Sequence, residues 1–209
     1  MLINKLNETS KFKEFRSKYI YVGKNKYIDG FHEGIDLSSE KYKEQEIFCE
    51  ISGVVSDKSY NRNSYGNKLV IKSDLSFLGK IFENDYIYGL YGHLDRYEDG
   101  IEIGKNVEEG EIIGYMGNTG FCLTKIDKIK RNGEIIYLDN YRRVTEEESK
   151  NKNFIGGIHL HLSFFVDKYE VVKKIEDLIE NKKDLYIFQW GKYWFNPIKF
   201  IKFYKDIKG

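Results

Sequence analysis

Residues Gly156–Val166 read Gly-Gly-Ile-His-Leu-His-Leu-Ser-Phe-Phe-Val, and this composition predicts a β-strand preceded by two glycines. Side chains alternate between the faces of a strand, so His159 and His161 point to the same side, with Cα atoms about 6.6 Å apart. The apolar residues between and after them take the opposite face, which is predicted to be buried. Two imidazoles on the open face suit a metal site, where one binds the ion and the other stands over the ion's water. The alternative for so short a pattern is two polar residues on a half-exposed strand.

The chain has only four histidines, and the other two also lie in distinctive segments. His32 begins the sequence His-Glu-Gly-Ile-Asp, and His93 lies in Tyr-Gly-His-Leu. In an extended chain His32, Gly34 and Asp36 share a face, and the glycine leaves room for an ion. The helical His-Glu-x-x-His motif, in which a zinc peptidase places two histidines on one face of a helix, is absent. The alternative for Asp36 is an ordinary carboxylate at the end of a strand.

These three histidine motifs and the segments between them resemble the lysostaphin/LytM family of zinc peptidoglycan endopeptidases. The resemblance covers roughly residues 28–200, and it depends on the order of the motifs rather than on any one of them. The matching segments are His32–Asp36, the Tyr-Gly-Asn strand Tyr65–Ile71, Tyr91–Leu94, Val107–Gly114, the Gly-x-Thr-Gly run Gly117–Gly120, His159–His161 and Asn196-Pro197.

The resemblance implies one zinc ion per chain, bound by His32, Asp36 and His161. Two neutral imidazoles and a carboxylate leave one coordination position for water, whose pKa zinc lowers toward ~7. The resemblance also implies that His93 and His159 are active-site histidines that do not bind the ion. One would take a proton from the attacking water and pass it to the leaving amine, and the other would stabilise the oxyanion; either assignment fits.

The implied substrate is the peptide part of peptidoglycan, cut at an amide bond in a stem peptide or a cross-bridge. The implied location is the cell envelope, periplasmic or extracellular. The first 30 residues lack the apolar segment of a signal peptide, and no stretch is long enough to span a membrane.

The chain has 34 basic and 33 acidic residues, so its net charge is +1. This balance lacks the excess of basic residues that is typical of proteins that bind nucleic acid. We expect a monomer.

Short segments rich in strand-forming residues recur between turn residues, as is typical of an antiparallel sandwich or barrel. Together with the resemblance, they predict a mostly β protein: an antiparallel β-sandwich of the duplicated-hybrid-motif, LytM-like type, with zinc in an open groove, an inserted β-hairpin and one or two short helices. The clearest helix has an apolar face formed by Val171, Val172, Ile175, Leu178 and Ile179. The expected strands are Tyr19–Val22, Ile47–Ile51, Val54–Val55, Lys68–Lys72, Lys80–Phe82, Tyr86–Tyr91, Ile112–Met116 and Ile158–Val166.

We expect an N-terminal arm at residues 1–26 and a LytM-like metallopeptidase domain at residues 27–209. Within the arm, Ser10 is a candidate cap for a short helix; a solvated arm is the alternative. An insertion at residues 121–155 separates two motifs that are usually close in the family. It contains a hairpin signal around Asn132-Gly133 and a charged helical turn after Thr145, so we expect a hairpin plus a mobile loop. This insertion forms either a wall of the substrate groove or a surface decoration.

With 41% hydrophobic and 16% aromatic residues, the chain can fill the core of one domain. Cys49 and Cys122 form neither a disulfide framework nor a zinc cluster, so both are expected to be buried thiols.

Two other functions fit part of the pattern. A catalytically inactive LytM-like module that binds cell wall or activates another hydrolase would be expected to lose ligands, whereas this chain keeps all five matching positions. A phosphocarrier of the sugar-transport type also pairs two histidines on a similar fold, but it would need neither Asp36 nor the His32 motif.

Overall fold

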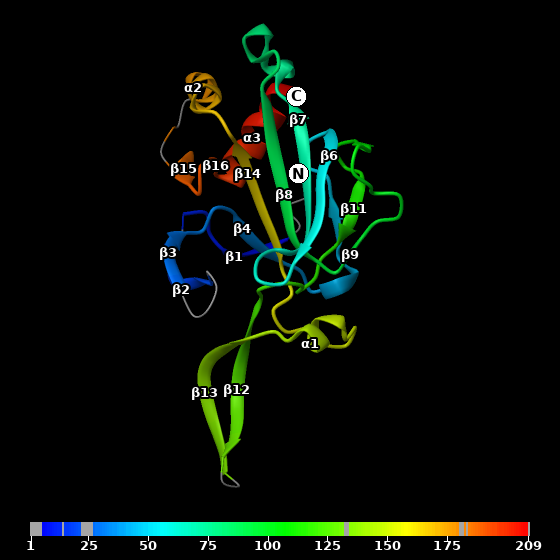
Figure 1. Cartoon of the computed structure of the whole chain (residues 1–209), viewed down its shortest axis with the longest axis vertical. Helices are drawn as coiled ribbons and strands as arrows, with labels where there is room; N and C mark the ends of the chain where they lie inside the picture. Colours follow the sequence, from blue (N-terminus) through cyan, green and yellow to red (C-terminus); the bar gives the residue numbers. More distant parts are fainter. Residues whose placement is uncertain are drawn as a thin grey trace.

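The computed structural model describes residues 6–13, 15–21, 27–131, 134–179, 182 and 184–208. Within these residues the protein is mostly β, as predicted, and its largest sheet has nine strands, all paired antiparallel (Figure 1). Seven strands follow the order β1 (Asn7–Ser10), β4 (Ile35–Ser38), β14 (Leu160–Val166), β8 (Tyr86–Leu94), β7 (Gly66–Asp74), β6 (Gly53–Asn61) and β10 (Asn106–Val107). The other two are β16 (Lys192–Phe195), which pairs with β14, and β15 (Tyr186–Gln189), which pairs with β16.

Smaller sheets surround this large one. A three-stranded sheet, seen beside β6 in Figure 1, has the order β5 (Glu46–Phe48), β11 (Ile112–Tyr115) and β9 (Arg96–Tyr97). Two separate hairpins are β2 (Phe15–Tyr21) with β3 (Tyr27–Phe31), and β12 (Leu123–Arg131) with β13 (Glu134–Arg143). The second confirms the predicted hairpin strands, although its Asn132-Gly133 turn lies outside the described residues. This hairpin stands away from the large sheet.

Three α-helices occur in the described chain, one more than the most that was expected: α1 (Glu146–Lys150), α2 (Tyr169–Leu178) and α3 (Pro197–Lys208). The amphipathic pattern predicted α2 correctly, and its buried residues are Val171, Val172 and Ile175. Thr145 caps α1 as expected, because its side chain accepts a hydrogen bond from the Glu148 backbone and the Glu148 carboxylate accepts one from the Thr145 backbone.

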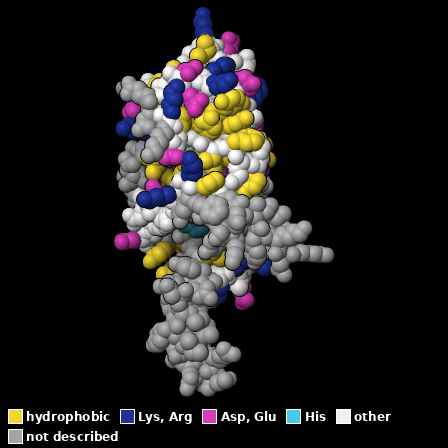
Figure 2. Space-filling model, turned by 90° about the vertical axis from the view of Figure 1, so that its left-hand side faces the viewer, with side chains coloured by type: hydrophobic (Ala, Val, Ile, Leu, Met, Phe, Trp, Pro, Cys, Tyr) yellow, Lys and Arg dark blue, Asp and Glu magenta, His cyan; other side chains and the backbone are white. Residues whose placement is uncertain are grey.

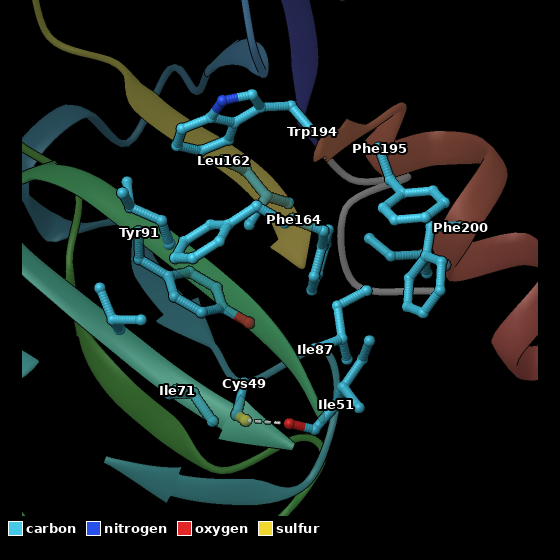
Figure 3. Packing of buried hydrophobic residues seen from close by; sticks show 14 of the residues in the cluster. Cys49, Ile51, Ile71, Ile87, Tyr91, Leu162, Phe164, Trp194, Phe195 and Phe200 are labelled. Carbon is cyan, nitrogen blue, oxygen red and sulfur yellow. Dashed lines mark hydrogen bonds between the residues drawn. The ribbon is translucent and has the colours of Figure 1, made fainter. Parts of the chain in front are cut away.

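The core lies between the sheets and under α3, and Figure 3 shows part of it. Phe195 and Phe200 pack at the α3 side, with ring centroids 5.6 Å apart. Tyr91 of β8 is almost fully buried, and its hydroxyl accepts a hydrogen bond of 3.0 Å from the backbone of Glu50. Burying each large apolar side chain contributes about 1.5–3 kcal/mol, so this cluster fixes the strands that carry the site.

Two predicted elements are wrong. Ser10 does not begin a helix, because residues 7–10 form β1 and pair with the edge of β4. Lys80–Phe82 is a 3-10 turn rather than a strand, with Phe82 fully buried as its anchor. The strand predicted at Ile158–Val166 begins later, at Leu160, and every residue of β14 is buried, so the expected open face is covered.

Candidate metal centre

The five candidate residues meet around the starts of β4 and β14 and the end of β8. β14 lies between the other two strands, and Asp36 of β4 stands directly opposite His161. On the other side, His161 faces Gly92, next to His93 in β8. His159 precedes β14 and is fixed by an isolated bridge to Gly117. Because adjacent strands hold these positions by backbone pairing, the geometry of the site follows from the register of the sheet.

His32, Asp36 and His161 converge on one point. His32 Nε2 lies 3.1 Å from His161 Nδ1 and 3.2 Å from Asp36 Oδ1, and His161 Nδ1 lies 3.1 Å from Asp36 Oδ1. His32 Nδ1 faces the carbonyl oxygen of Lys11 at 3.0 Å, so we assign its proton to Nδ1 and the lone pair on Nε2 to the cluster. All three side chains are buried. Two imidazole nitrogens and a carboxylate oxygen are a donor set that fits Zn²⁺.

The charge of Asp36 is favoured by its neighbours. Burial by itself would raise the pKa of this carboxyl, but the charge of His159 and the close contacts with the imidazoles of His161 and His32 hold the pKa well below its usual range. Asp36 therefore stays an anion, which is the form that binds a cation.

Gly34 permits this close approach. A Cβ atom at this position would lie 2.4 Å from the carbonyl oxygen of Leu162 and 2.8 Å from His161 Nε2. Any other residue would push His161 out of place.

His93 and His159 form a second pair beside the cluster, with ring centroids 4.6 Å apart. His93 Nδ1 faces the carbonyl oxygen of Thr119 at 2.8 Å, and His159 Nδ1 faces that of Gly157 at 3.0 Å. In each ring the proton is therefore assigned to Nδ1, which leaves Nε2 as the basic nitrogen. Burial, and then the charges of His159 and His161, hold the pKa of His93 well below its usual range.

The backbone at His93 is strained. Its φ of 63° lies in the left-handed region, which is uncommon for residues other than glycine. The His93 N–H donates to the carbonyl oxygen of Tyr65 at 2.6 Å, which helps to hold this conformation. Strain of this kind is often found where a side chain must point into a site.

Residues 30–130 match the sequence profile of peptidase family M23. The chain belongs to this family. A comparison with curated proteins finds no sequence that matches it.

Solved M23 peptidases are among the structures that this one matches. The catalytic domain of the antimicrobial peptidase lysostaphin from Staphylococcus simulans has 17% identity and a TM-score of 0.51, over 96% of this chain and 95% of that chain. The catalytic domain of the prophage-encoded M23 protein EnpA from Enterococcus faecalis has 16% identity and a TM-score of 0.45, over 78% and 82%. A zinc-containing peptidase from Vibrio cholerae has 20% identity and a TM-score of 0.42, over 76% and 32%. The match to the lysostaphin catalytic domain shows that the fold is lysostaphin-like.

Glu33 is a residue of this M23 site that the sequence reasoning missed. Its carboxylate Oε1 lies 3.7 Å from His161 Nε2, a buried nitrogen without a hydrogen-bond partner, and accepts a short hydrogen bond from the Tyr65 hydroxyl. Strict alternation from His32 would turn Glu33 away from the site. The chain bends at residues 33 and 34 instead, and this brings the carboxylate back.

In the view of Figure 2, histidine colour is visible in a hollow of the surface. Within the described chain, no helix is long and apolar enough to cross a bilayer.

Both cysteines are buried free thiols, as predicted. Arg142 and Arg143 have protein partners: Arg142 pairs with Glu148, and Arg143 Nη1 donates to Asn63.

Proposed function

We propose that this M23 peptidase is a zinc-dependent endopeptidase that hydrolyses amide bonds in the stem peptides or cross-bridges of peptidoglycan. The observation that carries the proposal is that His32 Nε2, Asp36 Oδ1 and His161 Nδ1 lie about 3 Å from one another. The chain that holds them belongs to a family of peptidases. The lysostaphin catalytic domain, which this fold resembles, is described as that of an antimicrobial peptidase, and this supports the proposal.

His32, Asp36 and His161 would hold the ion through Nε2, a carboxylate oxygen and Nδ1. A bound zinc supplies a Lewis acid and an acidic water at neutral pH. His161 Nε2 then carries the proton, and Glu33 is the carboxylate within reach of that N–H. A carboxylate behind a ligating imidazole fixes the ring and raises its basicity, so Glu33 would orient His161.

The two remaining histidines would move protons. His93 is held neutral, so its Nε2 can accept a proton from the attacking water. His159 Nε2 lies 3.8 Å from Asp36 Oδ1, so an imidazolium at His159 is paired with a carboxylate. In this assignment His159 donates to the developing oxyanion and protonates the leaving amine.

The proposed function is tested with purified protein and defined muropeptides. We expect products that differ from the substrate by one hydrolysed amide bond, identified by mass spectrometry. After excess zinc has been removed by dialysis, we expect one zinc per chain by elemental analysis. The His161→Ala variant should lose both properties. A parent protein that contains zinc and leaves every stem peptide and cross-bridge intact would favour the inactive wall-binding alternative. Full zinc occupancy in the His161→Ala variant would overturn the ligand assignment.

A further inference from the structure

A second group of metal-binding side chains lies beside the first. His93, Cys122 and His159 each offer one ligand atom, and these three atoms lie within 4.8 Å of one another. Cys122 follows the Gly117–Gly120 turn and is 1% exposed, and His159 is partly open to solvent. This trio shares no residue with His32, Asp36 and His161.

One backbone carbonyl organises two members of the trio. The oxygen of Thr119 accepts the hydrogen bond from His93 Nδ1 at 2.8 Å and one from Cys122 Sγ at 3.4 Å. His159 Nδ1 is held by Gly157 in the same manner. Metal-ligating histidines are commonly held in this way, with one ring nitrogen donating to a carbonyl and the other presenting its lone pair.

The donor types point to a particular class of ion. Two imidazole nitrogens and one sulfur suit tetrahedral Zn²⁺ and other thiophilic divalent ions. The first trio has a carboxylate oxygen where this one has sulfur. Cys49 is equally buried, and its thiol also donates to a backbone carbonyl oxygen, that of Ile51. It differs from Cys122 in that no such group of described residues includes it.

We propose that His93, Cys122 and His159 form a second, inhibitory site for zinc or another thiophilic divalent cation. On binding, two metal–nitrogen bonds and one metal–sulfur bond form, the S–H bond breaks and its proton goes to solvent, with no change of oxidation state. An ion bound there would keep His93 from accepting a proton and His159 from donating one, and the proposed hydrolysis requires both steps. Metal binding at this site is independent of the proposed function, whereas the inhibition rests on it.

The test is a titration of metal-free protein with Cd²⁺, followed by ultraviolet absorption, because cadmium bound to a thiolate gives a charge-transfer band. We expect two equivalents of cadmium to bind, one of them with this band. Cys122→Ser should bind one equivalent without the band. Cys49→Ser is the matched control, a buried thiol outside the trio, and should behave like the parent.

Two outcomes overturn the second site: the parent shows no charge-transfer band at saturating cadmium, or the band persists in Cys122→Ser. The absence of the band is measured on the parent protein, so this outcome does not depend on whether Cys122→Ser folds. If the first site does not exist, the parent binds a single equivalent that carries the band, so the two failures are distinguishable.

The inhibition is tested separately with excess zinc. If the muropeptide assay shows hydrolysis, we compare the zinc concentration that halves its rate. For Cys122→Ser this concentration should be at least about tenfold higher than for the parent and Cys49→Ser, because removing a ligand weakens metal binding at least as much as removing the residue behind a ligand. Equal sensitivity in all three proteins would overturn the inhibitory role.

Discussion

Glu33 offers a test that separates metal affinity from folding. Glu33→Gln keeps the size of the side chain but removes the charge that faces His161 Nε2. We expect zinc affinity to fall by about 10–100-fold, the usual effect of losing a carboxylate behind a ligating histidine. Competition with a chromogenic chelator measures this change. Glu83→Gln, an exposed glutamate far from the ligands in sequence, is the control, and equal affinity in both variants would contradict the role of Glu33.

His93 and His159 are predicted to fail in different ways. Both His93→Ala and His159→Ala should retain zinc and lose about two to four orders of magnitude in turnover. A substrate with an activated leaving group needs less protonation, so it should restore activity to His159→Ala and not to His93→Ala. The comparison of amide and activated-ester substrates measures this difference. Rescue of His93→Ala alone would reverse the two assignments.

At the scale of elements, α1 is tied to the base of the β12–β13 hairpin by a charge pair. The Arg142 guanidinium, and then the Thr145 N–H, hold the pKa of Glu148 at about 2, below its ordinary 4.5. A lowered carboxyl pKa stabilises the fold fully above about pH 4.5, and this contribution is lost as the pH falls toward about 2. Glu148→Gln should therefore lower the urea midpoint at pH 6 and leave it nearly unchanged near pH 2. The pair is partly exposed, so the difference should be small and should shrink in salt. Glu147→Gln, at the exposed neighbouring position, is the control. If Glu148→Gln still lowers the urea midpoint near pH 2, the ionised Glu148 carboxylate is not the source of the stability difference.

The β12–β13 hairpin can be shortened without disturbing its base. Lys125 pairs with Tyr141, so a two-residue Asn-Gly turn between them would replace residues 126–140. The nine residues of β12 span about 30 Å, and the hairpin points away from the sheet. We therefore expect the shortened protein to keep the zinc content of the parent and to hydrolyse small muropeptides at the parental rate. We expect it to hydrolyse intact sacculi more slowly than the parent does. Parental rates on both substrates would favour the surface-decoration reading of the insertion.

For the whole molecule, zinc should act as a cross-link between distant parts of the chain. Asp36 and His161 are separated by 125 residues. Zinc that binds only the folded protein stabilises it by about 4 kcal/mol at a free concentration 1,000 times the Kd. Removing zinc with a chelator should thus lower the Tm of the parent and leave that of His161→Ala unchanged. An equal decrease in both proteins would contradict binding through His161.

The sequence could predict those parts of the molecule that depend on periodicity. The spacing of two between His159 and His161 predicted that they point to one side, and both lie near Asp36. The apolar face of α2 predicted its helix. Alternation does not hold after His32, because the chain bends at residues 33 and 34. Helix α3 was missed because its aromatic residues also favour strands. Its start signal was nevertheless present, since Asn196 Oδ1 accepts a hydrogen bond from the Lys199 backbone and Pro197 takes the first turn.

Other parts depend on contacts that no local pattern encodes. The polar segment Asn7–Ser10 becomes a strand only because β4 offers it an edge. Glu33 reaches the site through a bend, and Cys122 meets His93 only because both contact Thr119. A single sequence contains no signal for such meetings between distant segments.

The pairing of Asp36 with His161 across β4 and β14 has one more consequence. A slip of one residue between these strands would place Leu160 or Leu162 opposite Asp36 and turn the imidazole to the other face. A chain assembled in that way could still be compact, but it would have no place for an ion. Under the proposed function, only correctly paired molecules would retain zinc at this site, so the ratio of zinc to protein in a preparation would report the fraction with the correct strand register.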